Sequence, residues 1–176
     1  MREPFAVCIS GHRPERLPTG SALHMMQSLL YCEIETAIAD GANQFYVGMA
    51  RGTDLWAADM ILYFRSQHPQ IRLTAVLPYQ DRSRSIRGAE RFHVHAVLSA
   101  ADNIISISEH YYKGCFRARN AYMIEHSKRI IALMLDEKSG TGQTIRMAKR
   151  AGLELRILSA EMAKQQTAPA HEFFRF

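Results

Sequence analysis

The sequence has few cysteines, no long apolar run and no internal repeat. Its three cysteines, Cys8, Cys32 and Cys115, are too few for a disulfide framework, and their spacing matches no zinc pattern. Free thiols such as these persist in reducing compartments. No apolar run approaches the roughly 20 residues that a membrane span needs. The first residues lead directly into a strand-like stretch and lack the form of a signal peptide. These absences predict a soluble cytoplasmic protein.

The chain also lacks a large excess of one charge. It has 176 residues, 47% apolar and 22% charged, which excludes disordered and collagen-like classes and fits a single domain. Lysine and arginine number 22 against 17 aspartates and glutamates, a net charge of +5 that favours anionic ligands without by itself indicating nucleic acid. Part of the excess lies in an arginine-rich segment, residues 82–91, with Arg82, Arg84, Arg87 and Arg91.

Short apolar runs alternate with segments of helical periodicity. Six runs predict strands: residues 5–9, 44–48, 71–77, 103–107, 129–135 and 154–158. The intervening helices are predicted to begin near Ser21, Thr53, Glu90 and Thr141 and at an undefined point before Tyr122. Continuously apolar strands are typical of a parallel sheet covered on both faces.

The predicted fold is therefore a doubly wound, mostly parallel α/β domain of Rossmann-like type. It spans residues 1–160, with helices on both faces of about six strands. A polar tail follows over residues 161–176 and ends in an aromatic cluster, Phe173, Phe174 and Phe176. We expect the tail to be loosely ordered or to cover a partner subunit in a homo-oligomer.

Each notable polar cluster directly follows a predicted strand. Ligands of doubly wound sheets bind beyond the carboxyl ends of the strands, so these clusters are expected to share one edge. The first is Ser10-Gly11-His12-Arg13-Pro14. Its glycine admits a ligand to the backbone, Arg13 can clamp a phosphate or carboxylate, and His12 can donate a proton or orient a ligand. A tight turn with an exposed histidine and arginine is the alternative.

The second cluster, residues 48–54, opens a helix. Gly48 and Gly52 free the backbone, Arg51 adds positive charge, and a helix N-terminus favours an anion. Asp54 binds a ribose hydroxyl in this interpretation, or simply stabilises the helix dipole. The cluster is neither a Rossmann glycine fingerprint nor a Walker A loop, because neither motif occurs in the chain.

Two further clusters complete the edge. Arg119 and Asn120 suit a sugar phosphate, and Glu125 on the same helix is either a general base or a solvated charge. Residues 137–144 combine two glycines with hydroxyl side chains at a helix start, the composition of a phosphate cradle or of an ordinary capped loop. The candidate acid–base groups, His12, Asp54 and Glu125, are paired by no sequence rule. No metal-binding pattern is present, since His93 and His95 fall on different sides of a helix.

The order of these motifs resembles the SLOG superfamily of Rossmann-like proteins, and within it the YpsA-like family of bacteria and phages. The resemblance covers roughly residues 4–158. It rests on four motifs: Gly-His-Arg-Pro, Gly-x-Ala-Arg-Gly-x-Asp, Arg-Asn-x-x-Met-Ile and Ser-Gly-Thr-x-x-Thr. It implies a site for a nucleotide, a nucleoside phosphate or an ADP-ribose derivative. The implied ligand-facing residues are Gly11, His12, Arg13, Gly48, Arg51, Gly52, Asp54, Arg119, Asn120, Ser139, Gly140, Thr141 and Thr144.

The same superfamily includes LOG phosphoribohydrolases and the DNA-processing protein A that loads recombinase onto single-stranded DNA. Here no glutamate stands at the place of the catalytic glutamate of LOG enzymes, which argues against N-glycosidic hydrolysis.

Three functions follow as hypotheses. The first is a binding protein or sensor for a nucleotide-derived small molecule, without a resident cofactor. The second is a nucleoside-phosphate hydrolase or transferase that uses Asp54 or Glu125 as acid–base. The third is a single-stranded nucleic-acid binder with an arginine track over residues 82–91 and at Arg117 and Arg119. The sequence leaves the ligand, any reaction and the oligomeric state open.

Overall fold

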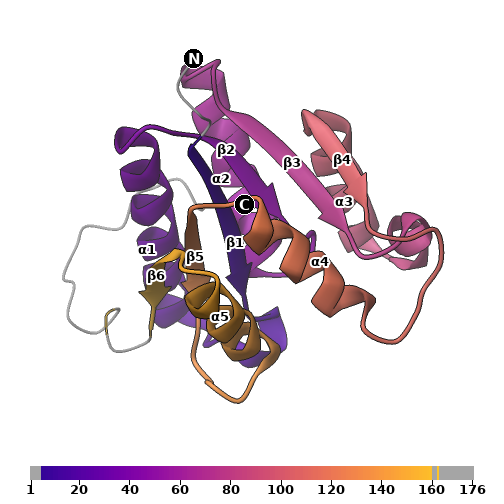
Figure 1. Cartoon of the computed structure of the whole chain (residues 1–176). Helices are drawn as coiled ribbons and strands as arrows, with labels where there is room; N and C mark the ends of the chain where they lie inside the picture. Colours follow the sequence, from indigo (N-terminus) through magenta and orange to yellow (C-terminus); the bar gives the residue numbers. More distant parts are fainter. Residues whose placement is uncertain (1–4, 160–161, 163–176) are drawn as a thin grey trace.

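A computed structural model describes residues 5–159 and Met162. Its centre is a sheet of six parallel strands in the order β4-β3-β2-β1-β5-β6 (Figure 1). The strands are β1 (Phe5–Gly11), β2 (Ala42–Val47), β3 (Arg72–Leu77), β4 (Asn103–Ser106), β5 (Arg129–Leu133) and β6 (Glu154–Leu158). In the central register, Cys8 lies opposite Tyr46 on one side and Ile130 on the other. The predicted fold class is confirmed.

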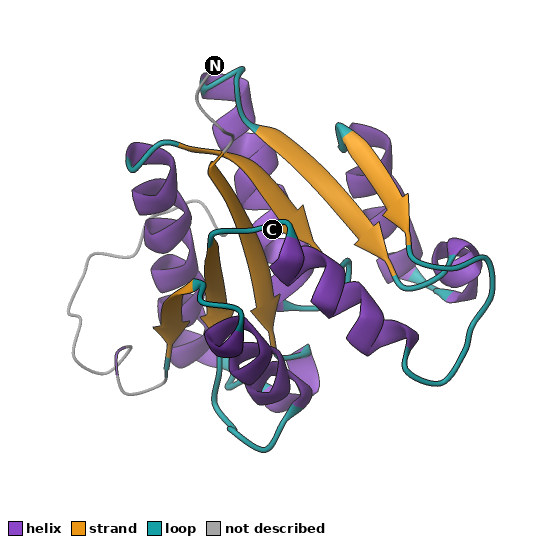
Figure 2. Cartoon of the chain, in the orientation of Figure 1, coloured by secondary structure: helices purple, strands orange, loops and turns teal. Residues whose placement is uncertain are grey.

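Helices cover both faces of the sheet (Figure 2). The α-helices of the described chain are α1 (Gly20–Ala39), α2 (Thr53–Gln67), α3 (Ala89–Ala100), α4 (Cys115–Glu125) and α5 (Gly140–Arg150). The first three pack on one face, and α4 and α5 pack on the other. Two short 3-10 helices, η1 (Pro14–Arg16) and η2 (Gln80–Ser85), lie between β1 and α1 and between β3 and α3.

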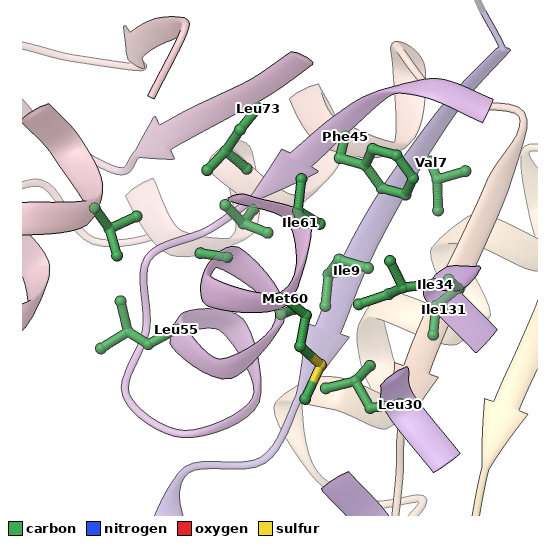
Figure 3. Close-up of a cluster of buried hydrophobic side chains, with 14 of the residues drawn as sticks. Val7, Ile9, Leu30, Ile34, Phe45, Leu55, Met60, Ile61, Leu73 and Ile131 are labelled. Atoms are coloured by element: carbon green, nitrogen blue, oxygen red, sulfur yellow. The ribbon is translucent and has the colours of Figure 1, made fainter. Parts of the chain in front are cut away.

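Side-chain packing on both faces of the sheet explains the unbroken apolar runs in the sequence of the strands. Val7 and Ile9 point from β1 toward α1 and α2, whereas Cys8 between them points toward α4 and α5. Figure 3 shows the first of these layers, in which Ile34 of α1 and Ile61 of α2 meet the sheet. Because both faces are covered, successive residues of the central strands, 6–9 of β1 and 130–133 of β5, are all buried and all apolar.

The helices that have a predicted start, α1, α2, α3 and α5, begin within one residue of it. At α5 the N-cap is Ser139, whose Oγ accepts from the Gly142 N–H at 3.1 Å, so the helix begins at Gly140 and not at Thr141. At α2 the cap position is Gly52, with φ 81°, which favours glycine. Thr53 is the first helical residue, and its hydroxyl donates to the His12 carbonyl oxygen at 3.1 Å.

The strand order places the polar clusters. β1 lies between β2 and β5, and α4 carries the chain from the edge strand β4 back to β5, so the order reverses at β1 and β5. Loops after β1, β2 and β5 therefore meet at the carboxyl edge of the sheet. The predicted tail, residues 161–176, lies outside the described residues apart from Met162. Within the described part of the chain, every helix is too short or too polar to cross a membrane.

Candidate functional site

A cleft of about 320 Å³ opens at the carboxyl end of β1, where the strand order reverses. Its walls come from the loop after β1, the first turn of α2, the face of α4 and the first turn of α5. Ten of the predicted ligand-facing residues line it: Gly11, His12, Arg13, Asp54, Arg119, Asn120, Ser139, Gly140, Thr141 and Thr144. Residues from four separate clusters thus share one concave surface.

The start of α5 presents backbone donors to this cleft. The first-turn N–H groups of a helix have no partner within the helix. Ser139 satisfies the Gly142 N–H, and the Ser139 N–H donates to the Asp136 carbonyl oxygen at 3.2 Å. Among the described residues, the N–H groups of Gly140 and Thr141 have no hydrogen-bond acceptor. Both residues line the cleft. Two donors at the positive end of a helix dipole favour an anion.

A buried ion pair forms the floor between α2 and α4. Arg119 donates through Nη1 to the Gly48 carbonyl oxygen, and the same nitrogen lies 3.9 Å from Oδ2 of Asp54. That carboxylate also accepts from the Ala50 N–H at 3.1 Å. Burial raises the pKa of Asp54 and lowers the pKa of Arg119, and the charge of each group opposes the shift of the other. The pair therefore fixes the guanidinium of Arg119 at the cleft with the carboxylate of Asp54 beside it, so that the two charges largely offset each other.

A chain of polar contacts extends from this pair to α5. Nε of Arg119 donates to Oδ1 of Asn120 at 2.7 Å, and Nδ2 of Asn120 donates to Oγ1 of Thr144 at 2.8 Å. The Thr144 hydroxyl donates in turn to the Gly140 carbonyl oxygen at 3.0 Å. These bonds tie α2, α4 and α5 together, so the wall of the cleft is preorganised. Asn120 and Thr144 thereby position the start of α5 as well as line the cleft.

His12 is held as a neutral ring. Its Nε2 accepts from the Leu135 N–H at 2.9 Å, which assigns the ring proton to Nδ1. Burial lowers the pKa of His12, and the charge of Arg16 lowers it further. With Nε2 occupied, Nδ1–H is the remaining polar group of the ring, and it is a donor.

Three predicted ligand-facing residues do not line the cleft. Gly48 leaves room for the guanidinium of Arg119, which a side chain at position 48 would overlap. Gly52 packs against the His12 carbonyl oxygen. Arg51 turns away and pairs with Glu15 and, at 3.3 Å, with Glu90.

Glu125 is also remote from the cleft. It is the last residue of α4, and its side chain is exposed. Of the three candidate acid–base groups, only His12 and Asp54 line the cleft, and both are already hydrogen-bonded.

Phe116 is a cleft residue that the sequence analysis did not single out. The guanidinium carbon of Arg119 lies 5.9 Å from the centre of its ring, and that of Arg82 lies 6.0 Å away. A signal was present, because Phe116 precedes Arg119 and Asn120 by three and four residues and so shares their helix face. Glu15 and Arg16, which also line the cleft, lie in η1 and carry no comparable signal.

Comparison with known proteins agrees with the motif pattern. A family model described as YpsA, the YspA SLOG family, matches residues 7–156. The chain belongs to the YpsA family. A UPF0398 protein of Halalkalibacterium halodurans is 29% identical over 111 residues, covering 62% of this chain and 59% of that relative. A UPF0398 protein of Bacillus cereus strain G9842 is 24% identical over 153 residues, covering 83% of each.

Solved structures similar to this YpsA-family chain include two of DNA processing protein A. The protein from Helicobacter pylori, described for its single-stranded DNA binding mode, has a TM-score of 0.61 and 25% identity. The match covers 88% of this chain and 65% of that one. The protein from Streptococcus pneumoniae has a TM-score of 0.57 and 16% identity, covering 86% and 49%, and shows the shared fold.

Proposed function

We propose that this YpsA-family protein binds a nucleotide-derived small molecule, such as a nucleoside phosphate or an ADP-ribose derivative, through its phosphate. The observation that carries the proposal is the convergence of the first turn of α5, Arg13 and Arg119 on one cleft. The volume of about 320 Å³ is at the lower end of ligand pockets, which suits a mononucleotide better than a dinucleotide.

The expected contacts follow from the donors available. Phosphate oxygens accept from the N–H groups of Gly140 and Thr141, as at other helix N-termini. Arg13 closes the exposed side, and it forms no ion pair with a carboxylate in the described part of the chain. The ring of Phe116 offers an apolar surface for the base or for the sugar face.

The contacts favour binding over the hydrolase or transferase hypothesis. A general acid–base needs a free proton-transfer group within reach of the substrate. Asp54 is engaged by Arg119 and by the Ala50 N–H, Nε2 of His12 is occupied, and Glu125 lies elsewhere. We therefore assign the cleft to a binding protein or sensor.

The experiment is a thermal-shift screen with AMP, cyclic nucleotides, NAD and ADP-ribose. A ligand that binds only the native state adds about 2.7 kcal/mol of stability at 100 times its dissociation constant. We expect one of these compounds to raise the melting temperature saturably.

Two matched variants test whether the ligand binds in the cleft or elsewhere on the surface. Arg13→Ala removes a charge-assisted hydrogen bond and should weaken binding by about 1.5–3 kcal/mol. Arg150→Ala, at the opposite end of α5, should bind as the wild type does. Absence of any shift across the panel contradicts the proposal, and equal loss in both variants removes Arg13 from the site.

Single-stranded nucleic acid is the second candidate ligand. The likeness to the H. pylori protein supports it, and so does the surface beside the cleft. Arg82, over the ring of Phe116, begins the arginine-rich segment 82–91. Large exposed aromatic side chains follow it in the chain: Phe92 at 78%, Tyr111 at 65% and Tyr112 at 44%. Positive charge along the backbone path together with aromatic side chains for base stacking is typical of single-strand binding surfaces.

Salt dependence tests this second candidate. Each phosphate contact contributes roughly −0.7 to the slope of log affinity against log salt for a single strand. The double variant Arg84→Ala/Arg87→Ala should reduce the slope for an oligothymidylate by about 1.4. Lys149→Ala/Arg150→Ala on α5 is the charge-matched control. Binding that is absent or independent of salt excludes this candidate.

A further inference from the structure

A second hollow, larger than the cleft, lies on the opposite helical layer. It is an apolar groove of about 740 Å³ between α1 and α2, with His93 of α3 at its rim. Its apolar walls are Leu23 and Tyr31 of α1 and Trp56, Met60, Leu62 and Tyr63 of α2. These side chains are buried or half-buried, so the groove is a concave apolar surface of the kind that can take apolar side chains. The groove shares no lining residue with the cleft.

The chain carries a segment whose chemistry matches this groove. Residues 173–176 read Phe-Phe-Arg-Phe, three aromatic side chains and one cation. Residues 163–172 before them contain no large apolar side chain and one proline. A polar spacer followed by an aromatic cluster has the composition of a tethered anchor.

The spacer is long enough to bring this anchor to the groove. Met162 follows β6 closely, and β6 packs against α1, which forms one wall of the groove. Ten residues lie between Met162 and Phe173, and the eleven steps from one to the other span up to about 36 Å when extended. The helix to be passed, α1, is about 10–12 Å across with its side chains.

The groove and the aromatic segment also carry opposite charges. Asp59 of α2 lies in the groove wall, and its carboxylate accepts from Nε2 of His93 at 2.8 Å on one side of the groove. Its side chain is 44% exposed, so it can also meet an incoming cation. Arg175 is the cation of the aromatic segment and stands between Phe174 and Phe176.

We propose that residues 173–176 dock in the α1–α2 groove of their own chain, with phenylalanine rings on its apolar walls and Arg175 beside Asp59. The tether keeps the segment at a high effective concentration near the groove, which favours the same chain over a second copy. The groove is then an internal docking site that covers apolar surface, separate from the nucleotide cleft.

Trp56 makes the proposal testable, because it is the single tryptophan of the chain and lines the groove. The experiment compares the wild type with the full-length variant Phe173→Ser/Phe174→Ser/Phe176→Ser. We expect the variant to show red-shifted tryptophan emission and stronger quenching by acrylamide, with an unchanged circular dichroism spectrum. The spacer variant Lys164→Ala/Gln165→Ala/Gln166→Ala should match the wild type. Identical emission in the aromatic variant and the wild type overturns the proposal.

A synthetic peptide of residues 163–176 distinguishes the occupants. The peptide should restore the wild-type emission of the aromatic variant saturably and leave the wild type unchanged. Leu62→Glu, introduced into the aromatic variant, should abolish this restoration. If the wild-type emission instead depends on protein concentration and light scattering shows a dimer that the aromatic variant cannot form, a second copy fills the groove and the proposal is wrong. Nucleotide binding is measured in parallel and should be equal in the wild type and the aromatic variant.

Discussion

At the scale of single residues, Gly48 is the position most tightly constrained by the buried ion pair. A Cβ atom there would overlap the guanidinium of Arg119, which donates to the Gly48 carbonyl oxygen. Gly48→Ala must therefore displace Arg119 from Asp54 or strain the end of β2. We expect a loss of about 1–3 kcal/mol in the free energy of unfolding, the usual range for overpacking. Urea denaturation at pH 7 measures it.

Gly140→Ala is the matched control for Gly48→Ala. Nothing lies within 4 Å of the position that its Cβ would take, and its backbone is helical. Its stability should stay within about 0.5 kcal/mol of the wild type or rise slightly, because alanine restricts the unfolded chain. Equal denaturation midpoints for the two variants would mean that Arg119 is free to move.

The residues around Gly48 also show what sequence could and could not predict about the cleft. His12, Arg13 and Ser139 were predicted to converge because residues that follow parallel strands share one edge, and the structure brings them together. Arg51 and Arg119 were equally good candidates by type. Glu15 and Glu90, distant in sequence, hold Arg51 outside, whereas Arg119 is buried against Gly48. Such long-range pairings have no local signal.

His12 supplies a pH prediction at the same scale. Its pKa in the folded protein lies below the ordinary value of about 6.5, so the native state favours the neutral ring. The stability that this neutral ring contributes is complete above about pH 6.5 and is lost as the pH falls through the lower folded pKa. Protonation also ends the role of Nε2 as acceptor for the Leu135 N–H.

We expect the free energy of unfolding to fall more steeply from pH 7 to pH 5 in the wild type than in His12→Gln. The measurement is urea denaturation across that range. His110→Gln, at an exposed histidine, should keep the wild-type slope. A parallel pH profile for wild type and His12→Gln would contradict the lowered pKa of His12.

At the scale of elements, Asp102, which lies just before β4, links α2 to the sheet through hydrogen bonds to its carboxylate. Its Oδ2 accepts from Nη1 of Arg65 on α2 and from the Leu73 N–H on β3, each at 2.8 Å. Burial raises the pKa of Asp102, but the Leu73 N–H and the charges of Arg65 and Arg72 outweigh burial and hold the pKa below its ordinary value. The ionised carboxylate therefore stabilises the junction.

Asp102→Ala should lower the free energy of unfolding at pH 7 by about 1 kcal/mol, because partial exposure screens the ion pairs. The difference from the wild type should shrink on acidification. A lowered folded pKa gives stability that is present above about pH 3.9 and lost as the pH falls through the folded value. Asp81→Ala, which removes an exposed pair with Arg84, is the control and should change stability by less than about 0.5 kcal/mol.

Elements were predicted more reliably than their ends and their order. Apolar periodicity located each strand, and for β6 both ends agree with the prediction. The start of α5 lies one residue before the predicted start, because Ser139 provides the cap that the sequence suggested at Thr141. Strand order could not be predicted, because it depends on pairings between strands that are far apart in the sequence. The return from β4 to β5 is visible only in the three-dimensional arrangement.

At the scale of the whole molecule, the two proposed anion-binding surfaces adjoin each other at one edge of the sheet. The cleft holds Arg13 and Arg119, and the arginine-rich segment 82–91 reaches it through Arg82 and Phe116. A single strand that follows the segment would bring one of its phosphates to the start of α5. The two candidate ligands would then occupy the cleft in turn and exclude each other.

Competition tests this arrangement with a labelled 12-nucleotide oligothymidylate and fluorescence anisotropy. A saturating amount of the nucleotide that gives the largest thermal shift should weaken oligonucleotide binding competitively. Arg13→Ala should weaken both ligands, whereas Arg84→Ala/Arg87→Ala should weaken the oligonucleotide alone, because its arginines do not line the cleft. Oligonucleotide affinity that is unchanged by the nucleotide and by Arg13→Ala would place the strand on a separate surface. The cleft would then serve the small molecule by itself.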